Sequence, residues 1–360
     1  MKRRDFIKTA SLGGLATSAN LLVPSIAEAK AEFKWKMVTA WPKNFPGLGT
    51  NANLLAKMIT EMSNGRISIK VYGANELVPA FEVFDAVSSG TAEMGHAGAY
   101  YWKGKSEAVQ FFSGMPFGLN AQEMNAWLYY GGGMELWREA YKPFGIIPAA
   151  TGNTGAQMAG WFNREIKTME DLKGLKMRMP SLGGEVLRRA GGTTVNIPGG
   201  ELFTALQSGT LDAAEWVGPY NDLAFGFHKA AKYYYYPGWH EPSSTIEAMM
   251  NEKAFLTLPK DLQQIVLVAC KAANIDMLSE YTARNYQALD TLINKHKIKV
   301  LPLPKAVLKN LKALSEEVVL ELAAKDPLSK KIYTSVSQFQ TQVSKWSKIS
   351  EQASFQSRDL

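Results

Sequence analysis

The sequence predicts an α/β protein with two similar lobes, and three observations support that prediction. The chain has 360 residues, which exceeds the usual size of a domain with one hydrophobic core. Its 46% hydrophobic and 20% charged residues are typical of a folded globular protein rather than a disordered one. Two ungapped segments resemble each other, VFDAVSSGTAEMG from Val83 and LFTALQSGTLDAA from Leu202. A helix-to-strand corner that occurs twice is what two related lobes would contain.

Residues 1–29 have the pattern of an export signal. Basic residues precede a small and apolar run, which ends in an A-x-A cleavage site at residues 27–29. The pair Arg3-Arg4 with Phe6 is the twin-arginine pattern, an address that a receptor reads and not a membrane anchor. Ordinary secretion is the alternative. Removal of the signal takes away four basic and two acidic residues, so the formal charge falls from +7 to +5.

The mature chain is only mildly basic and has no clustered basic patch, so no nucleic-acid partner is expected. No later stretch has the roughly eighteen consecutive apolar residues of a membrane span, and the mature protein is expected to be soluble. Cys270 is the only cysteine and lies in an apolar run, which excludes an internal disulfide and predicts a buried structural thiol.

The first lobe is predicted from alternating strand and helix patterns. A strand over residues 33–41 is followed by a helix with apolar residues at helical spacing up to Met62. A second strand over residues 67–71 and a helix through Phe84 lead to the first copy of the repeat. Strands joined by crossover helices form an α/β sheet.

The segment after the first repeat carries candidate ligand contacts. Ligands of open α/β sheets bind beyond the carboxyl ends of strands, so Tyr100, Tyr101 and Trp102 are candidates for cleft walls, with a place in the core as the alternative. His96 aligns with Glu215 of the second copy and is expected to be a hydrogen-bonded structural residue. The sequence offers no evident partner for the other histidines His228 and His240.

The second lobe presents polar residues at predicted turns and strand ends. Asn153 and Gln157 offer amide groups that suit a carboxylate, a hydroxyl or a metal. Arg178 ends the predicted strand LKMRMP, where its guanidinium could hold a ligand carboxylate through two parallel hydrogen bonds. A surface ion pair is the alternative for that arginine. Glu215 follows the second repeat and is predicted to face the ligand, and Glu241 lies in a later turn.

The last third of the chain is predicted to be mainly helical. The strand from Ser243 is expected to return to the first lobe, and a long helix is expected from Asp261 to about Lys297. The tail is amphipathic, with Ile332, Val336, Phe339, Val343 and Trp346 at helical spacing, so this stripe should pack either on its own chain or on a second subunit. The predicted divisions are a signal at 1–29, lobe I at 30–152 with 243–257, lobe II at 153–242, a spanning segment at 258–325 and a C-terminal helix at 326–360.

At Arg178, at residues 200–220 and at the long helix after Leu258, the chain resembles the periplasmic solute receptors of tripartite ATP-independent periplasmic (TRAP) transporters, the DctP family. The resemblance covers essentially the whole mature chain. Its most specific part is KMRMPS, followed about twenty residues later by the helix that ends in LQSGTLDAAE. Gln157 together with AEWVGPYND and WHEPSS resembles the branch that binds 2-oxo acids or lactate through a metal ion.

This resemblance implies a two-lobed periplasmic solute-binding fold with a hinge, a long helix spanning both lobes and an extra C-terminal helix. It implies that Arg178 holds the substrate carboxylate, and that the membrane permease subunits of a TRAP transporter are the partners. In some members the C-terminal helix forms a homodimer. The implied metal-binding residues are Gln157, Glu215, Glu241 and the backbone carbonyl of Trp216, and the implied neighbours of the substrate are Asn153, Gln157, Glu215, Tyr100 and Tyr101.

The chemistry of these residues suits a hard cation. Carboxylate, amide and carbonyl oxygens bind Na⁺ or Ca²⁺ rather than zinc. If Glu215 and Glu241 both coordinate, the site charge favours calcium, whereas sodium is sufficient for one. An exported metal-dependent enzyme acting on 2-oxo acids is the main alternative, since a bound cation is a Lewis acid, but no nucleophile paired with a base is evident. A structural or adhesive protein would leave the polar cleft residues without a role.

Overall fold

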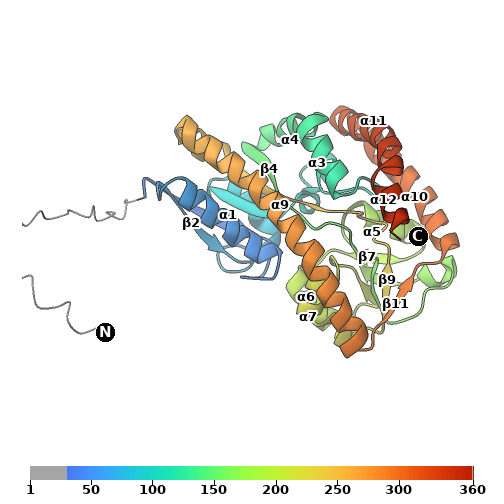
Figure 1. Ribbon diagram of the computed structural model, residues 1–360. Helices are drawn as coiled ribbons and strands as arrows, with labels where there is room; N and C mark the ends of the chain where they lie inside the picture. Colours follow the sequence, from blue (N-terminus) through green and yellow to red (C-terminus); the bar gives the residue numbers. More distant parts are fainter. Residues whose placement is uncertain (1–30, 359) are drawn as a thin grey trace, which may run out of the picture.

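The structure is a computed structural model that describes residues 31–358 and 360. Its strands form two separate sheets, as predicted for two lobes (Figure 1). Lobe I here denotes the five-stranded sheet, in the order β2-β1-β3-β10-β4, with the helices on it. Lobe II denotes the six-stranded sheet, in the order β11-β9-β5-β8-β6-β7, with its helices. The twin-arginine signal predicted at residues 1–29 lies outside the described residues.

In lobe I, β1 pairs in parallel with β2 and β3, and β10 inserts antiparallel between β3 and β4. The strand predicted from Ser243 therefore lies in the same sheet as the first strands of the chain. The strands are β1 Phe33–Thr39, β2 Ile67–Tyr72, β3 Met94–Gly98, β4 Ile146–Asn153 and β10 Thr245–Asn251. The helices are α1 Leu48–Met62, α2 Val83–Ser88, α3 Ala121–Tyr130, α4 Gly133–Tyr141 and α8 Glu252–Thr257, with short 3-10 turns η1 Ala80–Glu82, η2 Ala99–Trp102, η3 Glu107–Phe112 and η4 Lys142–Phe144.

In lobe II, β6 pairs in parallel with β7 and β8, which repeats the arrangement of β1 with β2 and β3. The strand of four tyrosines, β9, pairs antiparallel with β5 and parallel with β11. The strands are β5 Gly160–Phe162, β6 Lys176–Arg178, β7 Thr193–Val195, β8 Ala213–Ala214, β9 Tyr233–Tyr236 and β11 Lys299–Pro302. The helices are α5 Ser181–Arg189, α6 Gly199–Gln207 and α7 Pro219–Phe225, with the 3-10 turns η5 Met169–Leu172 and η6 Phe227–Lys229.

The two copies of the sequence repeat have the same local structure. Each helix is followed by a glycine with left-handed backbone, Gly90 at φ 79° and Gly209 at φ 73°, a conformation that glycine adopts without the steric cost of a Cβ. Two residues later the backbone turns back onto the helix: Ala92 N donates to Ala86 O and Leu211 N donates to Ala205 O, both at 3.0 Å. The repeat is therefore a repeat of structure as well as of letters.

An acidic residue holds each repeat against the neighbouring strand. A carboxylate oxygen of Glu93 accepts a hydrogen bond from the backbone N–H of Lys36 in β1 at 2.7 Å. At the matching position, Asp212 accepts from the backbone N–H of Lys176 in β6 at 2.9 Å. The correspondence therefore extends to the preceding strands, where KMV at residues 36–38 matches KMR at residues 176–178.

The long helix α9, Lys260–Asp290, runs across both lobes (Figure 1). It packs on α1 and β4 of lobe I and on α7 of lobe II, and its buried face includes Cys270 as predicted. A short π-helical turn, η7 Thr291–Lys295, follows it. The remaining helices are α10 Lys305–Ala324, α11 Pro327–Ile349 and α12 Glu351–Ser357, of which α10 packs on α5 and α11 packs on α3 and α4. Among the described residues, every helix is too short or too polar to cross a membrane.

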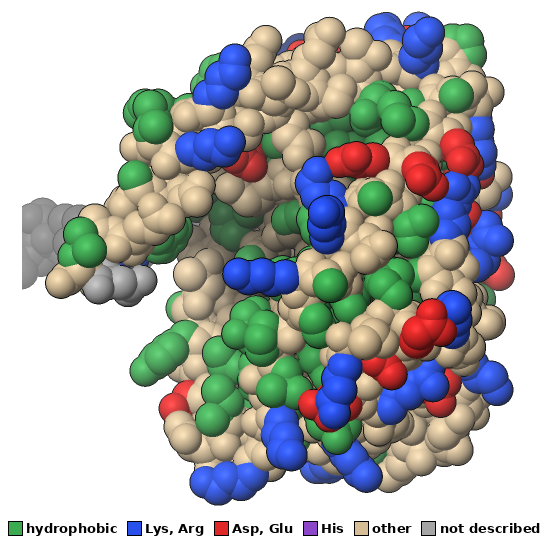
Figure 2. All heavy atoms as spheres, turned by 90° about the vertical axis from the view of Figure 1, so that its right-hand side faces the viewer, with side chains coloured by type: hydrophobic (Ala, Val, Ile, Leu, Met, Phe, Trp, Pro, Cys, Tyr) green, Lys and Arg blue, Asp and Glu red, His purple; other side chains and the backbone are tan. Residues whose placement is uncertain are grey.

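The C-terminal stripe packs on its own chain over half of its length. Ile332 and Val336 are fully buried, whereas Trp346 is 62% exposed and Phe355 is 60% exposed. On the neighbouring face shown in Figure 2, acidic and basic side chains are interspersed and do not form one basic patch. The beginning of the stripe therefore belongs to the fold of this chain, and its end is open to solvent.

Candidate functional site

Arg178 is a buried arginine at the carboxyl end of β6. Its side chain is 1% exposed, so the alternative of a surface ion pair is wrong. Nη1 donates to the backbone carbonyl of Glu215 at 2.7 Å and to both carboxylate oxygens of Glu215 at 3.1 and 3.2 Å. The Trp216 ring lies against the guanidinium, with its centroid 4.8 Å from Cζ. The second repeat thus delivers Glu215 and Trp216 directly to the arginine.

One edge of the Arg178 guanidinium is free. Nε and Nη2 are buried and have no hydrogen-bond partner among the residues that the structure describes. These two N–H groups point the same way and form the planar fork that binds a carboxylate through two parallel hydrogen bonds. Burial is the largest single influence and lowers the pKa of Arg178, but the charge of Glu215 together with Tyr101, Tyr100 and Glu241 raises it overall, so the side chain is a permanent cation.

The two segments that connect the sheets carry the next polar residues. We call residues 154–159 and 237–244 the crossing segments; they lie side by side, with Thr154 N donating to Ser244 O at 3.0 Å. Gln157 on one segment donates through Nε2 to Glu241 Oε2 on the other at 3.4 Å. Both side chains are buried, and Gln157 Oε1 and Glu241 Oε1 have no hydrogen-bond partner in the described part of the chain. Each of these two neighbouring side chains therefore keeps one oxygen without a partner.

The surrounding protein disfavours the ionised form of both Glu215 and Glu241. Burial raises the pKa of Glu215, the charge of Arg178 opposes the rise, and the charge of Glu241 adds to it. Burial also raises the pKa of Glu241. Since one buried arginine cannot offset two carboxylates, a further positive charge would favour the ionised form of both.

His240 is a residue of this cluster that the sequence interpretation left without a partner. It is 1% exposed, and its Nε2 lies 3.7 Å from Glu215 Oε2. Neither ring nitrogen has a hydrogen-bond partner among residues 31–358 and 360. Burial lowers the pKa of His240 to about 3, and the charge of Arg178 acts in the same direction. Its position next to Glu241 in WHEPSS was the one signal available in the sequence.

The other predicted site residues, Tyr100, Tyr101 and Asn153, have different surroundings. Tyr100 is buried, and Tyr101, which is partly buried, packs on it with ring centroids 4.6 Å apart. Asn153 is fully buried; its Oδ1 accepts from Gly155 N at 2.9 Å, and its Nδ2 lies 3.5 Å from Thr245 Oγ1 of β10. The structure therefore shows no free group on Asn153.

A small cavity lies where the two lobes meet at these residues. Its volume is about 10 Å³, the size of a site for one water molecule. Tryptophans from both lobes close it, Trp41 and Trp216, whose rings meet edge to face at 6.1 Å. The cavity is lined by Trp41, Leu48, Tyr100, Thr154, Gln157, Trp216, Val217, Ser244 and Ile246. Apolar and aromatic side chains therefore line this cavity together with Gln157.

The donor chemistry of the cluster fits a hard cation. In the described part of the chain, no group of three or more His, Cys, Asp or Glu side chains could hold a metal. A site built on Glu215 and Glu241 would therefore need amide or carbonyl oxygens, such as the orphaned Oε1 of Gln157. Such a mixed oxygen set is typical of sodium and calcium and unlike a zinc site.

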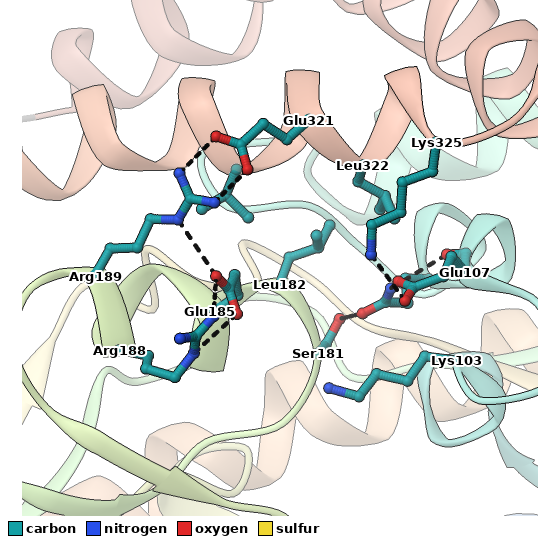
Figure 3. A pocket seen from close by; sticks show the side chains of 12 residues that line it. Lys103, Glu107, Ser181, Leu182, Glu185, Arg188, Arg189, Glu321, Leu322 and Lys325 are labelled. Atoms are coloured by element: carbon teal, nitrogen blue, oxygen red, sulfur yellow. Dashed lines mark hydrogen bonds and ion pairs between the residues drawn. The ribbon is translucent and has the colours of Figure 1, made fainter.

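A larger pocket of about 320 Å³ lies between the lobes and α10 but has a different character (Figure 3). Most of its charged residues are paired at the surface, Lys325 with Glu107 and Arg188 with Glu185, whereas no ion pair is drawn to Lys103 in Figure 3. At its base, Ser181 Oγ of lobe II lies 3.4 Å from Gln110 Oε1 of lobe I. Exposed pairs of this kind contribute little energy. Among the described residues, none of the side chains that line this pocket has a buried polar atom without a hydrogen-bond partner, in contrast to the Arg178 cluster.

His96 has two partners, which confirms its predicted structural role. Trp41 Nε1 donates to His96 Nδ1 at 2.8 Å, so the ring carries its proton on Nε2 and donates to Asn51 Oδ1 at 2.9 Å. Both partners are remote in sequence, 55 and 45 positions away, so the sequence alone does not identify them. His228 lies against the ring of His296, with centroids 4.1 Å apart, and takes no part in the Arg178 cluster.

The sequence and the structure are similar to those of known solute-binding proteins. The family model described as "Bacterial extracellular solute-binding protein, family 7" (DctP) matches residues 37–326. A monocarboxylate 2-oxoacid-binding periplasmic protein from Nostoc sp. is 43% identical over 358 residues, which cover 98% of this chain and 97% of the relative.

Two solved structures resemble the chain closely. One is a TRAP periplasmic solute-binding protein from Pseudoalteromonas atlantica with bound sodium and pyruvate, 46% identical with a TM-score of 0.88, over 90% of this chain and 99% of that one. The other is a TRAP periplasmic solute-binding protein from Colwellia psychrerythraea with bound calcium and pyruvate, 45% identical with a TM-score of 0.88, over the same shares of both chains.

Proposed function

The chain belongs to the bacterial extracellular solute-binding proteins of family 7 (DctP), and we propose that it is the extracytoplasmic receptor of a TRAP transporter for a 2-oxo or 2-hydroxy monocarboxylate bound together with calcium or sodium. The observation that carries this proposal is the buried Arg178 with its free Nε and Nη2 edge. A permanent buried cation with an open fork is a recognition element for a carboxylate. The pyruvate-bound relatives with sodium or calcium support the same ligand class.

In the proposed complex, Arg178 binds the ligand carboxylate and the cation is held by Gln157, Glu215, Glu241 and the backbone carbonyl of Trp216. The cation would offset the negative charge of the two glutamates and give the ligand a second point of attachment. Tyr100 and Tyr101 are proposed to neighbour the ligand on the side of lobe I. Asn153 is proposed to shape the loop that carries Gln157, because its own amide is already bonded there.

Ligand entry is proposed to require separation of the lobes. The cavity of about 10 Å³ is too small for a 2-oxo acid, and Trp41 and Trp216 close it from opposite lobes. Domain closure of this kind around a ligand is a common way to exclude water from polar contacts. The crossing segments would then act as the hinge, since they connect the two sheets. The division into lobes at residues 152 and 242 is part of this proposal.

The proposed function is that of a receptor and not of an enzyme. His240 lies beside Glu215 in the described cluster, but no serine or cysteine is hydrogen-bonded to either side chain as an activated nucleophile would be. The experiment for the enzyme alternative is incubation of the purified protein with pyruvate and calcium. Recovery of unchanged pyruvate is expected, and turnover would establish the enzyme instead.

The ligand class is tested by thermal shift. Purified mature protein would be melted with pyruvate, longer 2-oxo acids, lactate or C4-dicarboxylates, each in calcium, sodium or EDTA. We expect the largest rise in melting temperature for a monocarboxylate with an oxygen at carbon 2, and a smaller rise after chelation if the ion is calcium. Absence of any rise with all 2-oxo and 2-hydroxy acids in both cations would refute the proposed ligand class.

Two further proposals concern location and assembly. We propose a periplasmic protein exported through the twin-arginine signal, for which conversion of Arg3 and Arg4 to lysine should block export.

We also propose that the exposed end of the C-terminal helix pairs with a second copy, because Trp346 and Phe355 leave apolar surface open to solvent. Trp346→Glu should convert the dimer to a monomer in light scattering, and a wild-type monomer would contradict the proposal. The TRAP membrane subunits are the proposed recipients of the ligand.

A further inference from the structure

His240 is the buried histidine of the cluster that the proposed ligand contacts leave unexplained. Its side chain is 1% exposed, yet neither of its nitrogens has a hydrogen-bond partner among the described residues. The other fully buried histidine, His96, has both nitrogens bonded. Burying an unpaired polar group costs free energy, so a buried imidazole without partners calls for a functional explanation.

The surroundings of His240 hold its ring in place. A Cβ at Gly183 in α5 would lie 2.6 Å from the His240 Cβ, so only glycine allows the helix to approach so closely. The Trp239 ring meets the imidazole edge to face, with centroids 5.9 Å apart. The ring nitrogen Nε2 lies 3.7 Å from Glu215 Oε2. Among the described residues, Glu215 is the one acidic side chain within ion-pair distance of His240. The imidazole therefore belongs with Glu215 rather than with the general core.

The chemistry of the imidazole limits its role. An imidazole ring has at least one N–H donor in either protonation state, and His240 Nε2 is the nitrogen that faces Glu215 Oε2. A neutral nitrogen is a poor ligand for sodium or calcium, which prefer oxygen. A single N–H beside a carboxylate is instead the arrangement by which an outer side chain orients a metal-binding group.

We propose that His240 is a positioning residue, whose Nε2–H donates a hydrogen bond to Glu215 Oε2 when the cation is bound and holds that carboxylate toward the cation. The proposal rests on the proposed function, because it assigns a role at the same site. The present separation of 3.7 Å is longer than a hydrogen bond. In this structure Arg178 Nη1 donates to both carboxylate oxygens of Glu215. If a cation were coordinated by one of these oxygens, the other could accept a hydrogen bond from His240.

The test compares two substitutions at this position. His240→Gln keeps an N–H donor, whereas His240→Leu fills the space without one. Thermal shift with calcium alone, and calorimetric titration of calcium with and without pyruvate, would give the calcium concentration at half-saturation. We expect His240→Leu to raise that concentration about 10-fold or more, in line with the loss caused by removing outer partners of metal ligands, and His240→Gln to stay within about threefold of wild type.

Combination with Glu215→Gln separates positioning from direct contact. If His240 acts through Glu215, His240→Leu should change calcium half-saturation by less than about twofold once Glu215 is replaced. An undiminished effect in that background, or an equal loss in His240→Gln and His240→Leu, would overturn the proposal. His228→Leu is the matched control, since its buried nitrogens also lack recorded partners but lie outside the cluster.

The outcomes also distinguish this proposal from the proposed function. If wild-type protein binds no 2-oxo or 2-hydroxy acid in any cation, the proposed function and the role of His240 both fail. If wild-type protein binds pyruvate with calcium and His240→Leu matches it in calcium half-saturation, only the role of His240 fails. Melting temperatures of the variants without ligand would show whether each one is folded.

Discussion

The same structural corner occurs in both lobes, but the residues that complete it differ. In lobe I the corner brings together Val38 of β1 and His96 of β3, and in lobe II the matching positions hold Arg178 of β6 and Glu215 after β8. The scaffold around them is shared, including the left-handed glycine and the carboxylate that binds the neighbouring strand. The two lobes therefore differ in chemistry at positions where they agree in backbone.

The difference shows where binding capacity lies. Both nitrogens of His96 are bonded to Trp41 and Asn51, so the corner of lobe I is closed. At the corner of lobe II, Arg178 keeps Nε and Nη2 without partners in the described structure. Because buried polar groups in stable cores are nearly always paired, the lobe with unpaired groups is the one built for a ligand. The predictions below test this assignment.

The largest effect is expected when Arg178 of lobe II is replaced by valine, the residue at the matching position 38 of lobe I. Arg178→Val should weaken pyruvate binding at least about 100-fold, because it removes the carboxylate fork and leaves a buried glutamate unpaired. Calorimetry would measure the affinity, and circular dichroism would report whether the fold is kept. Lys176→Ala is the control, since that side chain lies on the same strand but is exposed. A folded Arg178→Val protein with an affinity close to wild type would break the comparison.

A smaller effect is expected from the charge of Glu215 alone. Glu215→Gln keeps the size of the side chain and one carbonyl oxygen, so we expect the calcium requirement for pyruvate binding to rise about 10- to 100-fold and not to disappear. Titration of calcium at fixed pyruvate would measure this change. The assignment of Glu215 to the cation would be wrong if Glu215→Gln bound pyruvate with the same calcium dependence as wild type.

The complementary change in lobe I should affect stability and leave binding intact. His96→Leu removes the partners of Trp41 and Asn51, which should lower the free energy of unfolding by about 1–3 kcal/mol. Urea denaturation would measure the loss, and the pyruvate affinity should stay within about threefold of wild type. An affinity loss as large as that of Arg178→Val would show that the corner of lobe I also serves the ligand.

The same histidine predicts a pH dependence. Burial lowers the pKa of His96 to about 3 from its ordinary value of 6.5, so the unfolded chain takes up a proton in this window before the folded chain does. The stability that His96 contributes is therefore present above pH 6.5 and falls as the pH drops toward 3, by at most about 1.4 kcal/mol per pH unit. Unfolding of wild type and His96→Leu at pH 7 and pH 4.5 should show a smaller decline for the variant, and equal declines would refute the assignment.

The contrast between the lobes was partly accessible from sequence. The repeat and the strand-helix order were predicted because helices, left-handed glycines and short strands follow from neighbouring residues. The contact of Arg178 with Glu215 joins residues 37 positions apart and depends on the register of β6 with β8, which no local pattern specifies. His240 shows the same limit: its neighbour Glu241 was predicted as a site residue, but the direction of the imidazole depends on the packing of α5.

The smallest effects should be equal in the two lobes, because they concern the part of the corner that is shared. Glu93→Ala and Asp212→Ala each remove an acceptor from one backbone N–H of the adjacent strand, at Lys36 and Lys176. Since both sites are partly exposed, water can replace the lost acceptor, and we expect each variant to lose about 0.5–1.5 kcal/mol of unfolding free energy with unchanged pyruvate affinity. Parallel urea titrations would test the equality. A loss of binding confined to Asp212→Ala would mean that the scaffold of lobe II, and not only Arg178 and Glu215, has been adapted to the ligand.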